Sequence, residues 1–182
     1  RASKNVDTEL KDKPEIEAAI RRTLGNTYTN LGEYEQAKEH LEKALMLNIK
    51  MYGNENEKVA VNFYDLALYY HWIGDLRKAD SLYNLSLSIF RKTLNEPTRD
   101  LAVTLNGCAL IQSDLGNFTL AVKQFEEALQ IIEKKHGKED KDYSSILNNL
   151  AITKALTLPQ QTFRKTNELH KFHMYFIIEY FI

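Results

Sequence analysis

The chain has 182 residues, a length that suits one domain or one short array of repeats, at roughly 100–200 residues per domain. Hydrophobic residues make up 43% and charged residues 27%, which are ordinary globular values and exclude wholesale disorder. Lysine and arginine number 24 against 25 acidic residues, and this balance argues against a nucleic-acid partner, because nucleic-acid modules carry a basic surplus. The single cysteine, Cys108, excludes a disulfide framework and a cysteine-based metal site.

Long helices are predicted because the chain contains few residues that break them. Seven glycines and three prolines leave little to interrupt a helix. No run of about 18 apolar residues is present, so we expect no membrane span, and we predict a cytoplasmic protein. The chain begins with Arg1 rather than methionine, so we expect a fragment or a processed chain.

Seven helices are predicted after an N-terminal lead-in, residues 1–13, which we expect to be poorly ordered. Apolar residues recur at the spacing of one helix face, as Ile16, Ile20 and Leu24 do in the first helix. Polar turn segments separate the periodic stretches. The predicted helices span residues 15–31, 34–52, 57–73, 76–94, 99–115, 118–135 and 141–157.

A repeat of 42 residues relates these segments. Gly32, Gly74 and Gly116 recur at this interval, each at the end of a first helix, where glycine can adopt the left-handed conformation. The residues that follow them are expected to cap the second helices, namely Glu33, Asp75 and Asn117. Small residues at one repeated position are predicted to be buried where paired helices approach closely, namely Ala37, Ala79 and Ala121. Large residues at another should fill the space toward the next pair, namely Leu41, Tyr83 and Phe125.

These patterns resemble tetratricopeptide repeats, in particular the 42-residue repeats of kinesin light chains and of many bacterial signalling proteins. The most specific part of the resemblance is Leu24-Gly25-x-x-Tyr28-x-x-x-Gly32-x-Tyr34-x-x-Ala37, with Leu147-Asn148-Asn149-Leu150-Ala151 at the start of a fourth unit. We predict an all-α fold, an α-solenoid of antiparallel helix hairpins that winds as a right-handed superhelix. The array covers residues 14–157, with units at about 15–56, 57–98 and 99–140 and a capping helix at 141–157.

The C-terminal segment, residues 158–182, departs from the repeat. Leu158-Pro159-Gln160-Gln161 stands where the glycine turn of a fourth pair is expected, so the helix at 141–157 is predicted to be a terminal cap. The stretch from Phe172 to Ile182 is strongly apolar and too short to span a bilayer. Three interpretations stay open: a degenerate helix over the last pair, an exposed end or gene-model artefact, or a segment that binds a membrane or a partner.

No catalytic, cofactor or metal site is predicted. His170 and His173 are one helix turn apart but lack a third ligand, and no glycine-rich phosphate loop is present. Cys108 takes a repeat position that is leucine in the other units, so we predict a small buried residue rather than a reactive thiol. We therefore predict that the chain is not an enzyme.

The predicted binding site is the concave wall of the solenoid, which the first helices of successive units line. An asparagine offers both a donor and an acceptor and can hold the backbone of an extended peptide. The resemblance to kinesin light chains implies this role for Asn106, Asn148 and Asn149. We expect nine side chains to face the groove, namely Arg22, Asn26, Asn30, Tyr64, Asp65, His71, Asn106, Asn148 and Asn149.

We predict a non-catalytic scaffold that binds a peptide or a partner helix in this groove, with no cofactor. Two alternatives stay open. Residues 14–25 resemble the lead-in to repeat arrays that follow bacterial Ser/Thr kinase domains, so the chain could be the sensor or scaffold portion of a larger signalling enzyme. The array could also self-associate, with the apolar C-terminal tail docking into the groove of a neighbour.

Overall fold

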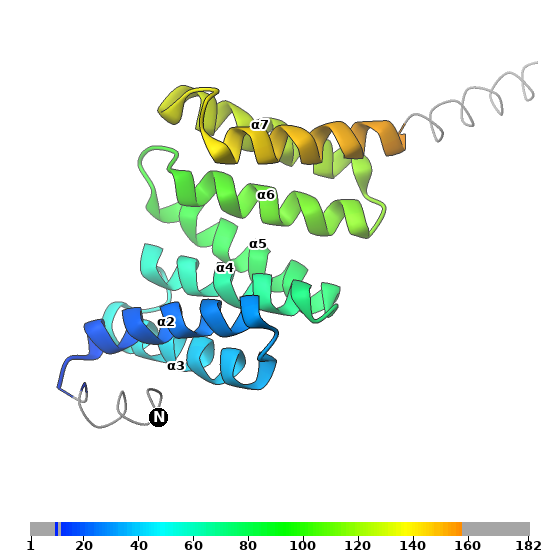
Figure 1. The fold of residues 1–182 in the computed structure, drawn as a ribbon. Helices are drawn as coiled ribbons and strands as arrows, with labels where there is room; N and C mark the ends of the chain where they lie inside the picture. The colour runs from blue at the N-terminus through cyan, green and yellow to red at the C-terminus, as the bar shows by residue number, and fades with distance from the viewer. Residues whose placement is uncertain (1–9, 11, 158–182) are drawn as a thin grey trace, which may run out of the picture.

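The computed structural model describes residue 10 and residues 12–157, which fold as a stack of antiparallel helix pairs (Figure 1). The predicted all-α solenoid is confirmed, and the predicted boundaries of the first six helices and the start of the seventh agree to within one residue. Most of the predicted lead-in, and the whole of the tail at 158–182, lies outside the described residues. The helices are α2 (Pro14–Leu31), α3 (Tyr34–Tyr52), α4 (Glu57–Trp72), α5 (Leu76–Thr93), α6 (Arg99–Asp114), α7 (Phe118–His136) and a helical segment at 141–157.

The turn inside each pair is closed by a glycine in the left-handed region. Gly32, Gly74 and Gly116 have φ values of 76°, 81° and 79°, where a side chain would strain the backbone. In the first turn the Gly32 N–H donates to the Thr29 carbonyl at 3.1 Å, and the next N–H donates to the Tyr28 carbonyl at 2.9 Å. These bonds satisfy the last carbonyls of the helix and turn the chain back on itself.

The predicted caps form at one of the three positions. Asp75 accepts a hydrogen bond from the Lys78 N–H at 3.2 Å, as expected for an N-cap. Glu33 and Asn117 make no cap hydrogen bond, so the prediction is wrong there. The Asn117 amide donates instead to the Gln112 side chain at 2.8 Å.

The close approach of paired helices is confirmed. Ala37, Ala79 and Ala121 are each 0% exposed. Tyr83 is also buried, and it reaches the next pair, because a Cβ at Gly107 of α6 would lie 2.5 Å from its ring. The missing side chain of Gly107 therefore makes room for the tyrosine between two pairs.

The first helices of successive pairs lie next to one another and form one wall of the stack (Figure 1). Helix α4 contacts both α2 and α6, and each second helix, α3 or α5, contacts the first helix of the following pair. The stack therefore presents a continuous surface built from α2, α4, α6 and residues 141–157.

Among the described residues, no helix has the combined length and apolar character that a membrane crossing requires.

Candidate functional site

We call that surface the first-helix wall, and every predicted groove residue lies on one of its four helices. Helix α4, between α2 and α6, supplies one aromatic, one acidic and one histidine side chain. The two flanking helices supply mostly amides. The residues are Arg22, Asn26 and Asn30 on α2, Tyr64, Asp65 and His71 on α4, Asn106 on α6, and Asn148 and Asn149 on the segment 141–157.

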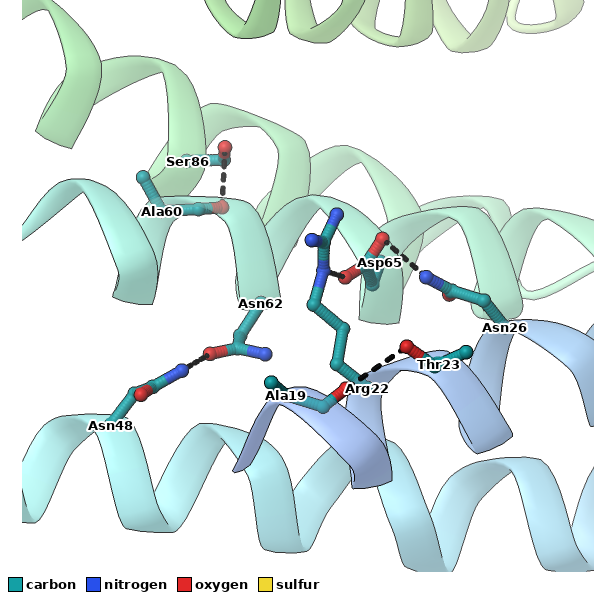
Figure 2. A network of polar contacts seen from close by, with 9 residues as sticks. All are labelled: Ala19, Arg22, Thr23, Asn26, Asn48, Ala60, Asn62, Asp65 and Ser86. Atoms are coloured by element: carbon teal, nitrogen blue, oxygen red, sulfur yellow. Dashed lines mark hydrogen bonds and ion pairs between the residues drawn. The ribbon is translucent and has the colours of Figure 1, made fainter. Parts of the chain in front are cut away.

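Three of these side chains form one hydrogen-bonded network between α2 and α4 (Figure 2). Asp65 is 3% exposed, and its two carboxylate oxygens accept hydrogen bonds from Arg22 Nε and, at 3.1 Å, from Asn26 Nδ2. Burial raises the pKa of the Asp65 carboxyl, and the Arg22 guanidinium and the Asn26 amide work against that rise. Arg22 and Asn26 therefore each use one hydrogen-bond donor to join two repeats.

Polar side chains also link α4 to α6 and α6 to the segment 141–157, each through two residues that are 43 positions apart. His71 lies 3.0 Å from the Asp114 carboxylate, and Asn149 donates to Asn106 at 3.1 Å. This spacing exceeds the repeat by one residue, so neighbouring first helices are staggered by one position. Arg22 and Asp65 obey the same rule. The sequence reasoning missed Asp114, which a search for complementary polar residues at this spacing would have found.

The same stagger fixes the start of the last helix. Arg99 on α6 donates Nε to Asp142 at 2.7 Å and Nη2 to both oxygens of Asp140 at 2.7 Å. Asp140 also accepts from the Asp142 N–H at 2.8 Å, and this backbone bond, together with Arg99, lowers the pKa of the Asp140 carboxyl. These contacts hold the segment 141–157 against α6 and so position its asparagines on the wall.

Two of the predicted asparagines have amides that are not engaged in the structure. Asn30 and Asn148 are exposed and make no side-chain hydrogen bond to another described residue. Tyr64 is half-buried, and its ring packs edge-on against the Tyr83 ring, with 5.6 Å between the ring centroids. Burial raises the pKa of Tyr64 to about 12. The wall thus offers free amides at its two ends and an aromatic ring in the middle.

Apolar side chains recur between the polar ones, again at the repeat interval. Val61 and Val103 occupy one repeated position and are half-buried. Leu68, Leu110 and Ile152 occupy another, and Ile152 is 54% exposed. We call these five residues the apolar strip. Partly exposed apolar side chains in a row offer a partner protein hydrophobic contact area.

Two buried amides meet at the junction between α3 and α4, a feature that the sequence reasoning missed. Asn48 Nδ2 donates to Asn62 Oδ1 at 2.5 Å, and both residues are buried (Figure 2). Asn62 Nδ2 has no partner in the described part of the chain. A buried donor without an acceptor typically costs about 1–3 kcal/mol. We call these two residues the amide pair.

The cysteine is structural in this fold. Cys108 is 1% exposed, and burial raises the pKa of its thiol to about 12, so it stays protonated at neutral pH. The prediction of a small buried residue is confirmed. Within the part of the chain that the structure describes, no three His, Cys, Asp or Glu residues cluster in a way that could hold a metal ion. His170 and His173 lie outside that part.

Similar sequences occur in longer proteins. A clustered mitochondria protein homolog from Aspergillus niger is 24% identical over 149 residues, which are 82% of this chain and 12% of that protein. Protein KINESIN LIGHT CHAIN-RELATED 1 from Arabidopsis thaliana is 28% identical over 123 residues, which are 67% of this chain and 20% of that protein. The chain therefore spans a fifth or less of the length of these relatives.

Solved structures share the fold. BtubC (BKLC) from P. vanneervenii superimposes with a TM-score of 0.74 at 21% identity, covering 85% of this chain and 62% of that one. A Podosopora anserina protein with nearly identical TPR-like repeats superimposes with a TM-score of 0.63 at 21% identity, covering 84% of this chain and 72% of that one.

The sequence profile of the tetratricopeptide repeat matches residues 16–92 and 101–142, more than half of the chain. These ranges contain the three glycine turns and the three buried alanines that define the helix pairs. Stacked repeats of this kind create extended binding surfaces for other proteins. The chain belongs to the tetratricopeptide repeat family, and its fold is that of a protein-interaction scaffold.

Proposed function

We propose that the first-helix wall binds an extended segment of a partner protein, either a peptide or a helix. The apolar strip carries this proposal, because its five residues recur at two repeat positions on α4, α6 and the segment 141–157 while remaining partly exposed. A partner that covers the strip gains hydrophobic contact area. A segment lying across the first helices would touch every repeat and not only one of them.

Amides beside the strip supply hydrogen bonds to a partner backbone. An asparagine side chain has two donor hydrogens and an acceptor oxygen with two lone pairs. The bond between Asn149 and Asn106 uses one donor and one lone pair, so both side chains keep capacity for a ligand. Asn148 is exposed and keeps all of its capacity for a ligand. Backbone contacts of this kind hold a chain without selecting its side chains.

Charge contributes little to this recognition. Arg22 pairs with the buried Asp65 carboxylate, and the His71 ring lies 3.0 Å from the Asp114 carboxylate. Paired opposite charges produce only a weak field at a distance, so they do not favour an acidic or a basic partner. We therefore expect binding that depends on apolar and amide contacts and varies little with salt.

A random-peptide display library provides the test. The full chain is used to select twelve-residue peptides, and a selected peptide is then titrated against the variant N106A/N148A/N149A. We expect at least tenfold weaker binding, because the variant lacks three amides worth about 0.5–1.5 kcal/mol each. Circular dichroism checks that the variant retains its helix content.

The matched control removes three exposed asparagines that lie away from the wall, as N54A/N84A/N95A. This variant should bind the selected peptide as tightly as the unchanged chain. Selected peptides that bind N106A/N148A/N149A with unchanged affinity would place the binding surface elsewhere and contradict the proposal.

Self-association is a second candidate, and the last helix favours it. Leu147 is 45% exposed and Ala151 is exposed, whereas the equivalent Leu105 and Ala109 of α6 are 0% exposed. The face that α6 buries is thus open on the segment 141–157, beside a hollow of about 710 Å³. Sedimentation equilibrium of the full chain and of Leu147→Asp tests this, because a dimer through this face should dissociate in the variant. A chain that is monomeric at 100 μM would contradict self-association, because this concentration is on the order of a weak specific dissociation constant.

A further inference from the structure

A pocket of about 310 Å³ opens where α2, α3 and α4 meet, at the N-terminal end of the first-helix wall. Glu15 and Lys58 lie on its charged rim, and Val61 of the apolar strip forms part of its lining. Asn48 also lines it and is 8% exposed. The pocket therefore joins the start of the proposed peptide path to the buried amide pair.

The charged groups around the pocket are already satisfied. Lys58 Nζ donates to Glu15 and, at 2.9 Å, to the Tyr52 hydroxyl. Arg22, which also lines the pocket, donates to Asp65. These two pairs hold two positive and two negative charges, so the pocket has no net formal charge to attract an ion.

The amide pair carries the free hydrogen-bonding capacity. Asn62 Nδ2 is buried without a partner and points toward α2, on the side of Ala19 and Arg22 (Figure 2). Rotating both amides by half a turn keeps the bond between them and transfers the free N–H to Asn48, which lines the pocket. The pair can therefore present one free N–H and a carbonyl lone pair to a guest.

We infer that this pocket binds a carboxamide, the side-chain group of glutamine or asparagine. The carbonyl of a carboxamide accepts the free N–H, and its NH2 group donates to an oxygen of the amide pair. A carboxylate has no donor for the oxygen of the amide pair, and an alkyl group would leave the buried N–H without an acceptor. That the carboxamide belongs to a bound peptide rests on the proposed function, whereas the preference for a carboxamide does not.

Small probes test the pocket directly. The ¹⁵N-labelled full chain is titrated with N-acetylglutamine methylamide and with the corresponding glutamate and norleucine compounds. We expect the glutamine probe to shift the side-chain NH2 signals of Asn48 and Asn62 and the backbone signal of Val61. The other two probes should bind at least threefold more weakly. Equal responses to all three probes would overturn the inference.

The chain provides its own matched variant. Ile132 and Ile146 stand at the repeat positions of the amide pair, so the variant N48I/N62I imports the residues of a later junction. It should lose the Val61 response to the glutamine probe at least fivefold, with a melting temperature that does not fall. An unchanged response would overturn the inference, and the comparison of probes on the unchanged chain does not depend on how this variant folds.

The variant N106A/N148A/N149A distinguishes the proposed peptide binding on the first-helix wall from the proposed carboxamide pocket. N106A/N148A/N149A should respond to the glutamine probe as the unchanged chain does, since those residues lie on α6 and the segment 141–157. If selected peptides bind this variant normally while the probe response persists, the proposed function fails and the carboxamide pocket stands. If the variant loses the peptide and the glutamine probe has no preference, the pocket fails and the proposed function stands.

Discussion

The junction between α3 and α4 differs from the two later junctions in what it buries. Asn48 and Asn62 occupy the positions that Phe90 and Thr104 take at the junction between α5 and α6. The later hydroxyl is satisfied within its own helix, because Thr104 donates to the Asp100 carbonyl at 2.8 Å. At the junction between α7 and the segment 141–157, both positions are isoleucine. One repeat position thus holds an unsatisfied amide in one unit and a packed alkyl group in another.

The same contrast extends into the first pair of helices. Arg21 is 1% exposed and donates to Glu17 at 2.7 Å, although its repeat equivalent in α6, Leu105, is fully buried and apolar. His40 stacks on Tyr28 at 5.6 Å beside it. In a solenoid each repeat is stabilised by its neighbours, so junction chemistry sets local stability. We therefore expect the pair α2 and α3 to be the least stable of the stack.

Placing an amide at an apolar junction is expected to have the largest effect. Ile132 is 0% exposed, and Ile132→Asn removes its apolar burial, worth about 1.5–3 kcal/mol. The new amide would face Ile146, which offers no acceptor, at a further cost of about 1–3 kcal/mol. Urea unfolding should therefore show a loss of about 3–5 kcal/mol.

The control places the same residue on the exposed side of the same helix, as Gln130→Asn. This variant should lose less than about 1 kcal/mol, since only helix propensity changes. A loss in Ile132→Asn as small as that in the control would mean that a buried amide is tolerated at any junction. The difference in residues between the first junction and the later ones would then have no effect on the free energy of unfolding.

The sequence predicted the part of the fold that the repeat fixes. The glycines at 42-residue intervals define the turn inside each pair and hence the end of each first helix, because backbone conformation there depends on one residue type. The caps were predicted less well. Asn117 has a suitable side chain, but the neighbouring Gln112 engages it, and no pattern along one chain reveals that competition.

The buried alanines should be equally intolerant of a large side chain in all three helix pairs, whereas the junctions differ from one another. Ala79 is 0% exposed, as are Ala37 and Ala121, so Ala79→Trp forces an indole into a filled contact. Overpacking of this kind costs about 1–3 kcal/mol, or ~2–4 °C in melting temperature for each kcal/mol. Thermal melts of Ala79→Trp, A37W and A121W should show similar losses.

A tryptophan on the exposed side of the same helix is the control for these melts. Leu85 is 48% exposed, and Leu85→Trp should melt within about 2 °C of the unchanged chain, because surface substitutions have small effects. Unchanged melting of Ala79→Trp would contradict the packing of the pairs. A loss confined to one of the three alanines would show that the pairs differ as the junctions do.

The candidate site was predicted in its location but not in its contacts. The repeat register places Asn106 and Asn149 on first helices, and that follows from periodicity alone. Their mutual hydrogen bond depends on the one-residue stagger between helices, which side-chain packing sets. The amide pair was missed for a related reason, because an asparagine in a periodic pattern suggests solvent and its burial depends on the neighbouring helix.

The smallest expected effect concerns Asp65, the acidic member of the polar network at the first junction. Burial raises the pKa of its carboxyl, so the folded protein binds a proton at Asp65 more tightly than the unfolded chain does. The free energy of unfolding should therefore fall as the pH rises from about 4, the ordinary value for an aspartate, through the raised value. Asp65→Asn keeps an acceptor oxygen for Asn26 and removes this titration.

Urea unfolding of the unchanged chain and of Asp65→Asn at several pH values between 4 and 7 measures the difference. The variant should gain stability relative to the unchanged chain as the pH rises, by about 1 kcal/mol or less, since Arg22 offsets much of the burial. Glu57→Gln, which removes an exposed carboxylate from the same helix, is measured alongside as the control. A relative loss of stability in Asp65→Asn at higher pH would mean that the Arg22 pairing outweighs burial. The polar network would then stabilise the first junction, and the expected order of stability along the stack would have to be reconsidered.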